Sequence, residues 1–356
     1  MLVVWSFIIY KAILCVGVFA LSLAIAAYST LWERKFAAFL QDRKGPSRAG
    51  PWGILQPLAD GGKMFFKEEI IPNVSNRFLF ILGPSLFMLT ALMTGTVIPW
   101  AKPFTGSDGT SYALQITDIN VGVLYLLGVV SVGVYGIMIG GWASNNKYAL
   151  LGAVRASSQM ISYEIAMGLS IIALIITSGG SLSLSEIIEG QDKGLANIVY
   201  QPLGFLIFFI CALAETNRAP FDLPECESEL VGGYHTEYSS MKLGLFLFAE
   251  YINLFISSAI MAGFYFGGYN FPFAQELYNS LGLENGSVWI SVIGASVYLI
   301  KIIIFITTFM WVRWTLPRFR YDQLMNLGWK ILIPLALLNL AITVGVEFLR
   351  GNITLN

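Results

Sequence analysis

Long apolar runs separated by short polar connections dominate this chain. A helix needs about 20 mostly apolar residues to cross a bilayer, and runs of about that length occur eight times. They lie near 10–32, 78–99, 120–141, 156–178, 198–216, 242–267, 288–312 and 330–349. The pattern predicts an all-α polytopic membrane protein with about eight transmembrane helices. An even number of crossings places both termini on the same side of the membrane.

The first polar connection, about 33–77, has a pattern of its own. Between residues 54 and 70, the apolar positions fall on one side of a helix, and Asp60, Lys63 and Lys67 fall on another. This spacing predicts a short amphipathic helix lying at the membrane interface. Pro57 and the adjacent glycines at 61–62 weaken the helix prediction.

Positive charge is divided unevenly between the two sets of connections. One set carries sixteen Lys and Arg residues and the opposite set only three. By the positive-inside rule, the basic connections face the cytoplasm and both termini face outward. The composition agrees with a membrane location, because only 12% of the residues are charged, against about 25% in soluble domains.

The cysteine and histidine content bears on metal chemistry. The three cysteines, Cys15, Cys211 and Cys226, have no C-x-x-C spacing, and His235 is the single histidine. A metal or iron–sulfur site made by this chain alone is therefore not expected.

Three of the predicted membrane segments are interrupted by charges that bear on function, at Glu164, Glu250 and Lys301. The apolar run 165–178 is about 14 residues, roughly 21 Å and too short for a bilayer, so its helix must extend back and draw Glu164 into the membrane. Glu250 follows Lys242 by eight residues, and Lys301 follows Val288 by thirteen. A lysine at that depth needs a carboxylate partner or a water-filled pocket. Glu164 and Glu250 are the candidate partners of Lys301. The alternative to a functional role for Lys301 is a purely structural ion pair.

Residues 214–230 form an acidic island between two membrane-length runs. Its carboxylates are Glu215, Asp222, Glu225, Glu227 and Glu229, and its one cation is Arg218. Like charges this close in a partly buried loop cannot all ionise cheaply, so at least one should hold a proton near pH 7. With Glu164, Glu250 and Lys301 they are predicted to form a proton-coupling chain. The alternatives are a solvated acidic loop and a structural carboxylate at Glu164.

These residues belong to longer motifs that resemble one family. The strings are E-R-K at 33–35, Q-D-R-K-G-P at 41–46, L-Q-P-L-A-D-G-G-K at 55–63, S-Y-E at 162–164, A-E-T-N-R-A-P-F-D-L-P-E at 214–225, G-Y-H-T-E-Y at 233–238, A-E-Y at 249–251 and W-V-R-W-T-L-P-R-F-R-Y-D-Q-L-M at 311–325. From the first span to the last, they resemble the quinone-facing membrane subunit of proton-pumping NADH:quinone oxidoreductase (respiratory complex I), which is the H subunit in bacterial naming.

The resemblance implies an eight-helix protein in the bacterial inner (plasma) membrane, with an organellar inner membrane as the alternative. Its partners would be two peripheral-arm subunits, one carrying the terminal iron–sulfur cluster, and small and antiporter-like membrane-arm subunits. The substrate would be ubiquinone or menaquinone, in a tunnel closed by the cytoplasmic loops. The chain itself would hold no flavin, cluster or metal, and its buried acids would couple quinone reduction to proton translocation.

A quinone requires an apolar tunnel with a few polar groups, and arginines can stabilise a developing quinol anion. Within a single membrane domain, 1–356, the loops 33–77, 215–241 and 313–330 are predicted to form the quinone site and docking surface. The candidate quinone-binding residues are Arg34, Asp60, Phe65, Phe221, Arg313, Arg318 and Arg320. Each arginine could instead serve as a positive-inside anchor that contacts lipid headgroups.

Two other functions fit parts of the pattern. One is the equivalent subunit of a membrane-bound hydrogenase or of a complex fed by a donor other than NADH. The other is a stand-alone ion-coupled secondary transporter, with Lys301 and the acids as its coupling site. The large charged loops and the lack of an inverted sequence repeat disfavour the transporter.

Overall fold

The computed structural model describes residues 2–106, 110–192, 195–222, 230–272, 274–283 and 286–351, with side chains from Phe7 onward. Seven helical segments in these ranges are long and apolar enough to cross a membrane. They correspond to α1 (Leu2–Leu40), α3 (Arg77–Thr94), α4 (Gly122–Ala143), α5 (Lys147–Thr177), α10 (Ser240–Phe266), α12 (Val288–Thr315) and α14 (Ile333–Leu349). The last segment begins at α13 (Tyr321–Asn326) and continues through a π-helical turn, η4 (Leu327–Leu332). The predicted all-α polytopic architecture is confirmed.

The eighth predicted span, 198–216, is shorter than the others. It consists of α7 (Asn197–Tyr200) followed by α8 (Pro202–Glu215). The 14 residues of α8 rise only about 21 Å, against the roughly 30 Å of a hydrocarbon core. Hydropathy located this apolar segment correctly, but α8 is shorter than the seven long helices.

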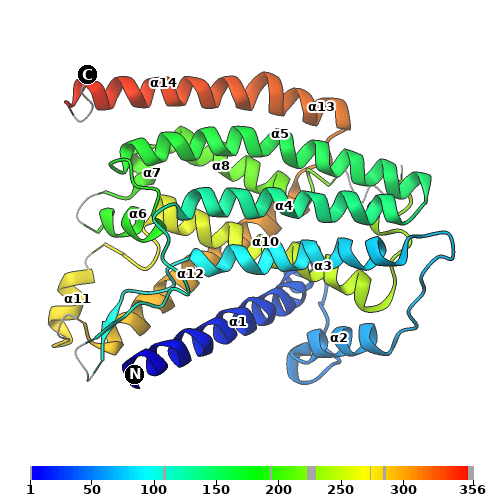
Figure 1. Ribbon diagram of the computed structural model, residues 1–356, viewed down its shortest axis with the longest axis horizontal. Coiled ribbons are helices and arrows are strands. Elements are labelled where there is room, and N and C mark those ends of the chain that lie inside the picture. The colour runs from blue at the N-terminus through cyan, green and yellow to red at the C-terminus, as the bar shows by residue number, and fades with distance from the viewer. Residues whose placement is uncertain are drawn as a thin grey trace.

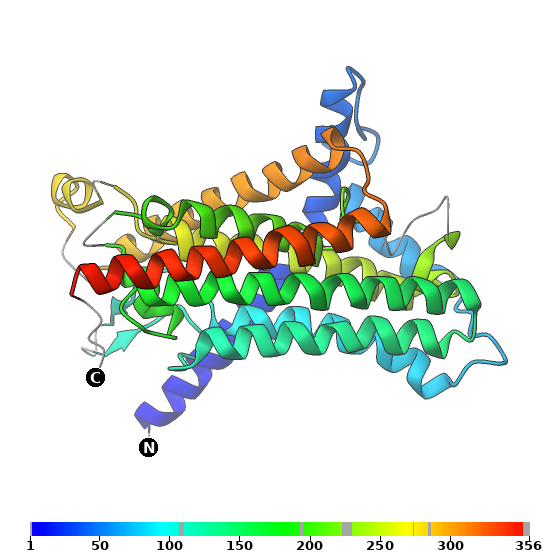
Figure 2. The same ribbon diagram turned by 90° about the horizontal axis from the view of Figure 1, so that it is seen from above.

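Helices α4, α5 and α14 run side by side along the molecule, while α1 crosses the bundle obliquely (Figures 1 and 2). Both views place the start of α1 and the end of α14 at the same end of the bundle. The short helices α6 (Leu184–Gly190) and α11 (Ala274–Ser280) lie at that end, and α2 (Gln56–Phe66) and α13 lie at the opposite end (Figure 1). The remaining short elements are β1 (Phe104–Thr105), paired antiparallel with β2 (Ser111–Tyr112), and the turns η1 (Pro51–Gly53), η2 (Gly95–Val97) and η3 (Gly233–His235).

Helix α10 is the centre of the bundle. In its most apolar stretch 72% of the residues are buried, against 11% for α1. It packs against α3, α12, α1 and α2, while α5 packs against α4, α8 and α14. Side chains of α10 can therefore contact α1, α2, α3 and α12.

Glycines allow α3 and α4 to pack in close contact. A Cβ added at Gly83 would lie 2.8 Å from the Cα of Gly140, and one at Gly136 would lie 2.8 Å from the backbone nitrogen of Phe87. Small residues at such crossings let the two backbones approach, which stabilises helix pairs in lipid.

The predicted amphipathic segment forms α2. Pro57 lies in its first turn, where a missing N–H costs nothing, so it starts the helix and does not interrupt it. Leu58, Phe65 and Phe66 are exposed, whereas Pro57 is buried and Asp60 is half-buried. One face of α2 therefore turns toward the bundle.

Candidate quinone pocket and buried carboxylates

A pocket lies between α1, α2 and α10, with a volume of about 170 Å³. We call it the α1–α2–α10 pocket. Its lining residues are Ala27, Thr30 and Arg34 from α1, Pro57, Asp60, Gly61 and Met64 from α2, and Gly244, Leu247, Phe248 and Tyr251 from α10. Most of these side chains are apolar or absent, and Arg34, Asp60 and Tyr251 supply the strongest polar groups. This is the composition expected of a site for a ligand with an apolar body and a polar end.

Two of the predicted quinone-binding residues meet at this pocket. Arg34 Nη1 lies 2.7 Å from Asp60 Oδ2, and Gln56 donates to the other carboxylate oxygen at 3.2 Å. The side chains of Arg34 and Asp60 are 51% and 29% exposed. An ion pair this exposed contributes about 1 kcal/mol at most to stability. Stabilisation of the fold therefore does not account for the presence of this pair.

Next to the pocket, one buried carboxylate holds two arginines. Glu33 accepts from Arg218 at 2.7 Å and from Tyr251 at 3.0 Å, and Arg313 forms an ion pair with its second oxygen. The side chains of Glu33 and Arg218 are each only 6% exposed. We call these four residues the Glu33 cluster. Because Tyr251 also lines the pocket, the cluster and the pocket share a side chain.

The Glu33 cluster explains how Arg218 stays charged inside the protein. Its guanidinium carbon lies 4.0 Å from the centre of the Tyr251 ring, within cation–π range. Burial alone would lower the pKa of the Arg218 guanidinium, but Glu33 foremost, together with Tyr251 and Glu250, holds that pKa above its ordinary value. Arg218 is thus a fixed positive charge among acids that come from several helices.

The described part of the acidic island is folded into the protein. Thr216, Asn217 and Arg218 are buried, and Asp222 is paired with Arg318 at 2.7 Å. Residues 214–222 therefore do not form a solvated loop. Glu225, Glu227 and Glu229 lie outside the described residues.

Phe221 and Arg320 do not reach the α1–α2–α10 pocket. Phe221 is 3% exposed and its ring packs between those of Tyr163 and Phe319, at centroid distances of 5.5 and 5.6 Å. Arg320 is largely exposed and pairs with Asp322 at 3.3 Å. The sequence showed an aromatic and a cation in polar loops, but it did not show which side of each loop faces the core.

The predicted intramembrane acids lie on separate helices around the bundle interior. Glu164 is in the middle of α5 and accepts from Ser131 of α4 at 2.9 Å. Glu250 of α10 accepts from Tyr234 at 2.7 Å. Glu215, the last residue of α8, is buried and lines a small cavity of about 10 Å³.

The predicted partner of Lys301 is wrong. Its ammonium group donates to the backbone carbonyls of Phe266, Gly268 and Asn270 at 2.5–2.8 Å, which uses all three of its donors. These carbonyls lie at and beyond the C-terminal end of α10, where a helix concentrates partial negative charge. The middle of α12 is therefore level with the end of α10, a relation that one sequence cannot reveal.

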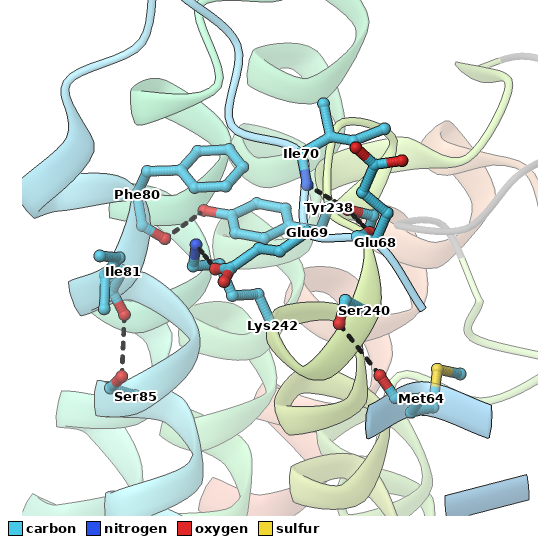
Figure 3. A network of polar contacts seen from close by, with 11 residues as sticks. Met64, Glu68, Glu69, Ile70, Phe80, Ile81, Ser85, Tyr238, Ser240 and Lys242 are labelled. Atoms are coloured by element: carbon cyan, nitrogen blue, oxygen red, sulfur yellow. Dashed lines mark hydrogen bonds and ion pairs between the residues drawn. The ribbon is translucent and has the colours of Figure 1, made fainter. Parts of the chain in front are cut away.

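The segment that follows α2 is tied to the start of α10. Lys242 forms an ion pair with Glu69, Ser240 donates to the carbonyl of Met64 at 3.0 Å, and the backbone nitrogen of Ile70 donates to Ser239 at 3.0 Å (Figure 3). Tyr238 donates to the carbonyl of Phe80 in α3 at 3.1 Å. These contacts hold α2 against α10 and thereby fix one wall of the pocket.

Known proteins resemble this chain along nearly its whole length. The profile of a family described as NADH dehydrogenase matches residues 12–344. An NADH-quinone oxidoreductase H subunit of Cytophaga hutchinsonii is 64% identical over 338 residues, which cover 95% of this chain and 96% of that protein. The H subunit of Flavobacterium johnsoniae is 59% identical over 98% of this chain and 97% of its own length, and subunit 8 of the Rhodothermus marinus enzyme is 46% identical over 96% and 97%.

The chain belongs to the H-subunit family of NADH-quinone oxidoreductase. The resemblance drawn from the motifs is confirmed, and membership makes the chain a membrane subunit of a multi-subunit enzyme in bacteria. Among the described residues, no three His, Cys, Asp or Glu side chains are grouped so that they could hold a metal ion.

Sequence reasoning missed several members of this site. Glu33 was recognised only as part of a motif, although an acid beside two basic residues at a helix end was a signal worth following. Tyr251 and Tyr234 were recognised only as parts of motifs, and Ser131 gave no signal, because a hydroxyl group becomes informative only when its acceptor is known. Glu69 appeared to be an ordinary charge in a polar connection.

Proposed function

We propose that this protein forms the part of the quinone tunnel that receives the quinone from the lipid, and that it transmits the charge change of quinone reduction to its buried acids. The observation that carries the proposal is the α1–α2–α10 pocket, whose apolar walls end at the Arg34–Asp60 pair and at Tyr251. Ubiquinone and menaquinone both have the long apolar tail and polar head that such a pocket suits.

In this proposal, the end of the bundle that carries α2 and α13 faces the cytoplasm, and both termini face outward. The loops 33–77, 215–241 and 313–330 then form the docking surface for the peripheral-arm subunits, and one of these supplies electrons from an iron–sulfur cluster. Small and antiporter-like membrane subunits would contact the helices. The dense positive charge of these loops supports this orientation.

Reduction of a quinone to a quinol takes up two electrons and two protons. The transient negative charge on the head group would act first on the Glu33 cluster, because Tyr251 belongs to both the pocket and the cluster. Arg218 would pass the change toward Glu250, and the loop 216–222 would pass it toward Glu215 and Glu164. Lys301 has no part in this path, because its donors are taken by the end of α10.

The quinone half of the proposal is tested with Asp60→Asn in the assembled enzyme. Losing the charge loosens Arg34, so the KM for quinone should rise about tenfold, which corresponds to about 1.4 kcal/mol. Electron transfer from NADH to ferricyanide should be unchanged, since that acceptor takes electrons upstream. Asp192→Asn is the matched control, because Asp192 pairs with Lys102 at the other end of the bundle. Equal effects of the two variants on the quinone KM would refute this half.

The coupling half is tested with Glu164→Gln, which keeps the shape of the side chain and removes its titratable group. We expect the variant to assemble and to lose proton pumping together with most of its quinone reductase turnover. Glu186→Gln is the control, since Glu186 also accepts from a serine, Ser181. Glu186 is exposed and lies in α6, at the end of the bundle that carries the termini. Full pumping by Glu164→Gln would exclude Glu164 from the coupling path.

A further inference from the structure

Gln159 is a buried polar residue of α5 to which neither the motifs nor the proposed path gives a role. Its side chain is fully buried, and its Nε2 donates to the carbonyl of Ala214 and to that of Phe221, both at 2.7 Å. Both partners are acceptors, so only the NH₂ group can serve them, and the orientation of the amide is fixed. The amide oxygen has no partner among the described residues.

The two carbonyls lie at either end of the loop that carries the coupling residues. Ala214 is the penultimate residue of α8 and directly precedes Glu215, while Phe221 directly precedes Asp222. Arg218 lies between them. One side chain therefore fixes both ends of a loop whose middle holds the buried arginine of the Glu33 cluster.

Other contacts hold the same loop against the same stretch of α5. The amide nitrogen of Asn217 lies 3.6 Å from Met160 Sδ, and the ring of Phe221 packs against that of Tyr163. The Gln159 bonds differ in joining both ends of the loop at once. Since Glu164 lies five residues further along α5, the helix rigidly connects Gln159, with its two hydrogen bonds to the loop, to Glu164.

Resting on the proposed function, we propose that Gln159 is a positioning residue that fixes the 216–222 loop relative to α5, so that the effect of quinone reduction on Arg218 and Asp222 reaches Glu215 and Glu164. Gln159 touches neither quinone nor a transferred proton. Its two short, buried hydrogen bonds keep the loop from relaxing independently of the helix.

A purely structural role is the competing explanation, because the carbonyl of Ala214 lies in the last turn of α8, where the ordinary i+4 partner of the helix is missing and the backbone nitrogen of Asn217 donates instead at 3.3 Å. A helix-capping residue would affect assembly and stability alone. A positioning residue would also change how turnover and pumping respond in enzyme that has assembled normally.

The experiment uses Gln159→Met in the whole complex, since methionine has a similar length and no donor. Gln201→Met is the matched control. Gln201 is also a buried glutamine with two side-chain bonds, to Thr343 at 2.7 Å and from Asn339 at 3.0 Å, but it lies at the other end of α8. For each variant one measures assembly, the NADH–ferricyanide rate, kcat and KM for quinone, and protons pumped per electron.

For Gln159→Met we expect a kcat for quinone about tenfold lower, because displacing a positioned group by ~1 Å can cost as much as about a hundredfold in rate. The quinone KM should stay near normal, since Gln159 does not line the α1–α2–α10 pocket. Protons pumped per electron should fall. Gln201→Met should keep normal kcat and stoichiometry in whatever fraction assembles.

If Gln159→Met does not assemble, Gln159→Glu replaces it, because a carboxyl group of the same shape donates at most one of the two bonds. The same split between kcat and KM is expected. Normal kcat and stoichiometry in the assembled variant would overturn the positioning role, as would equal losses for the Gln159 and Gln201 variants.

Asp222→Asn distinguishes failure of the Gln159 role from failure of the proposed function. If Asp222→Asn impairs coupling while the Gln159 variants do not, the positioning role of Gln159 is wrong and the proposed function is retained. If neither changes coupling, the proposed function itself fails at this loop.

Discussion

Filling the α1–α2–α10 pocket from α2 is the sharpest test of where the quinone tail lies. Gly61 lines the pocket, and a Cβ built on it meets no other atom within 4 Å. A Gly61→Leu side chain therefore starts from open space at its Cβ and is placed to extend toward the pocket. Gly62 offers the matched control, because its Cβ position is equally open but it does not line the pocket.

The expected magnitude follows from the displaced tail. A leucine side chain in a pocket of about 170 Å³ excludes a few methylene groups of the ligand, each worth about 0.8 kcal/mol when buried. Losing two or three of them costs about 2 kcal/mol, or about 30-fold in kcat/KM. Replacing glycine by leucine stabilises a helix by about the same amount at either position, so this effect cancels between the two variants.

The assay compares NADH-driven reduction of a long-tailed quinone with that of a short-tailed analogue, in complex normalised by its ferricyanide rate. Gly61→Leu should reduce kcat/KM for the long-tailed quinone about 30-fold and for the short-tailed one much less. Gly62→Leu should leave both near normal. If the Gly61 and Gly62 variants show the same kcat/KM for the long-tailed quinone, the tail does not pass through this pocket and the reasoning is wrong.

The remaining predictions concern the structural core. Lys301→Met should lower the stability of the complex by about 2 kcal/mol or more, because three carbonyls lose a charged donor. The number of protons pumped per electron should stay normal, and a change in that number would show that Lys301 takes part in coupling. Gly83→Val should reduce assembly, since its Cβ would lie 2.8 Å from an α4 backbone atom and overpacking costs about 1–3 kcal/mol. Gly128→Val, at an open position of α4, should assemble normally, and equal yields of the two would contradict the close helix contact. Glu33→Gln should destabilise the complex by about 3 kcal/mol or more, because Arg218 keeps its buried charge and loses its main counter-charge; thermal inactivation at wild-type temperature would disprove this.

The sequence alone determined the membrane architecture. Apolar runs of bilayer length locate the helices because a backbone in lipid must satisfy its own hydrogen bonds, and that constraint is local to each segment. The same local reasoning placed Glu164 inside the membrane, and α5 does begin at Lys147, well before its apolar run. The motifs sufficed to identify the family.

Tertiary structure decided which charges meet. Lys301 binds the end of α10, and the residues that join Glu33 come from three elements far away in the chain: Arg218, Tyr251 and Arg313. Such pairings depend on the relative heights and rotations of helices, which packing between helices sets and hydropathy does not record. The pocket likewise depends on tertiary structure, since its walls belong to three helices that become neighbours only when the bundle assembles.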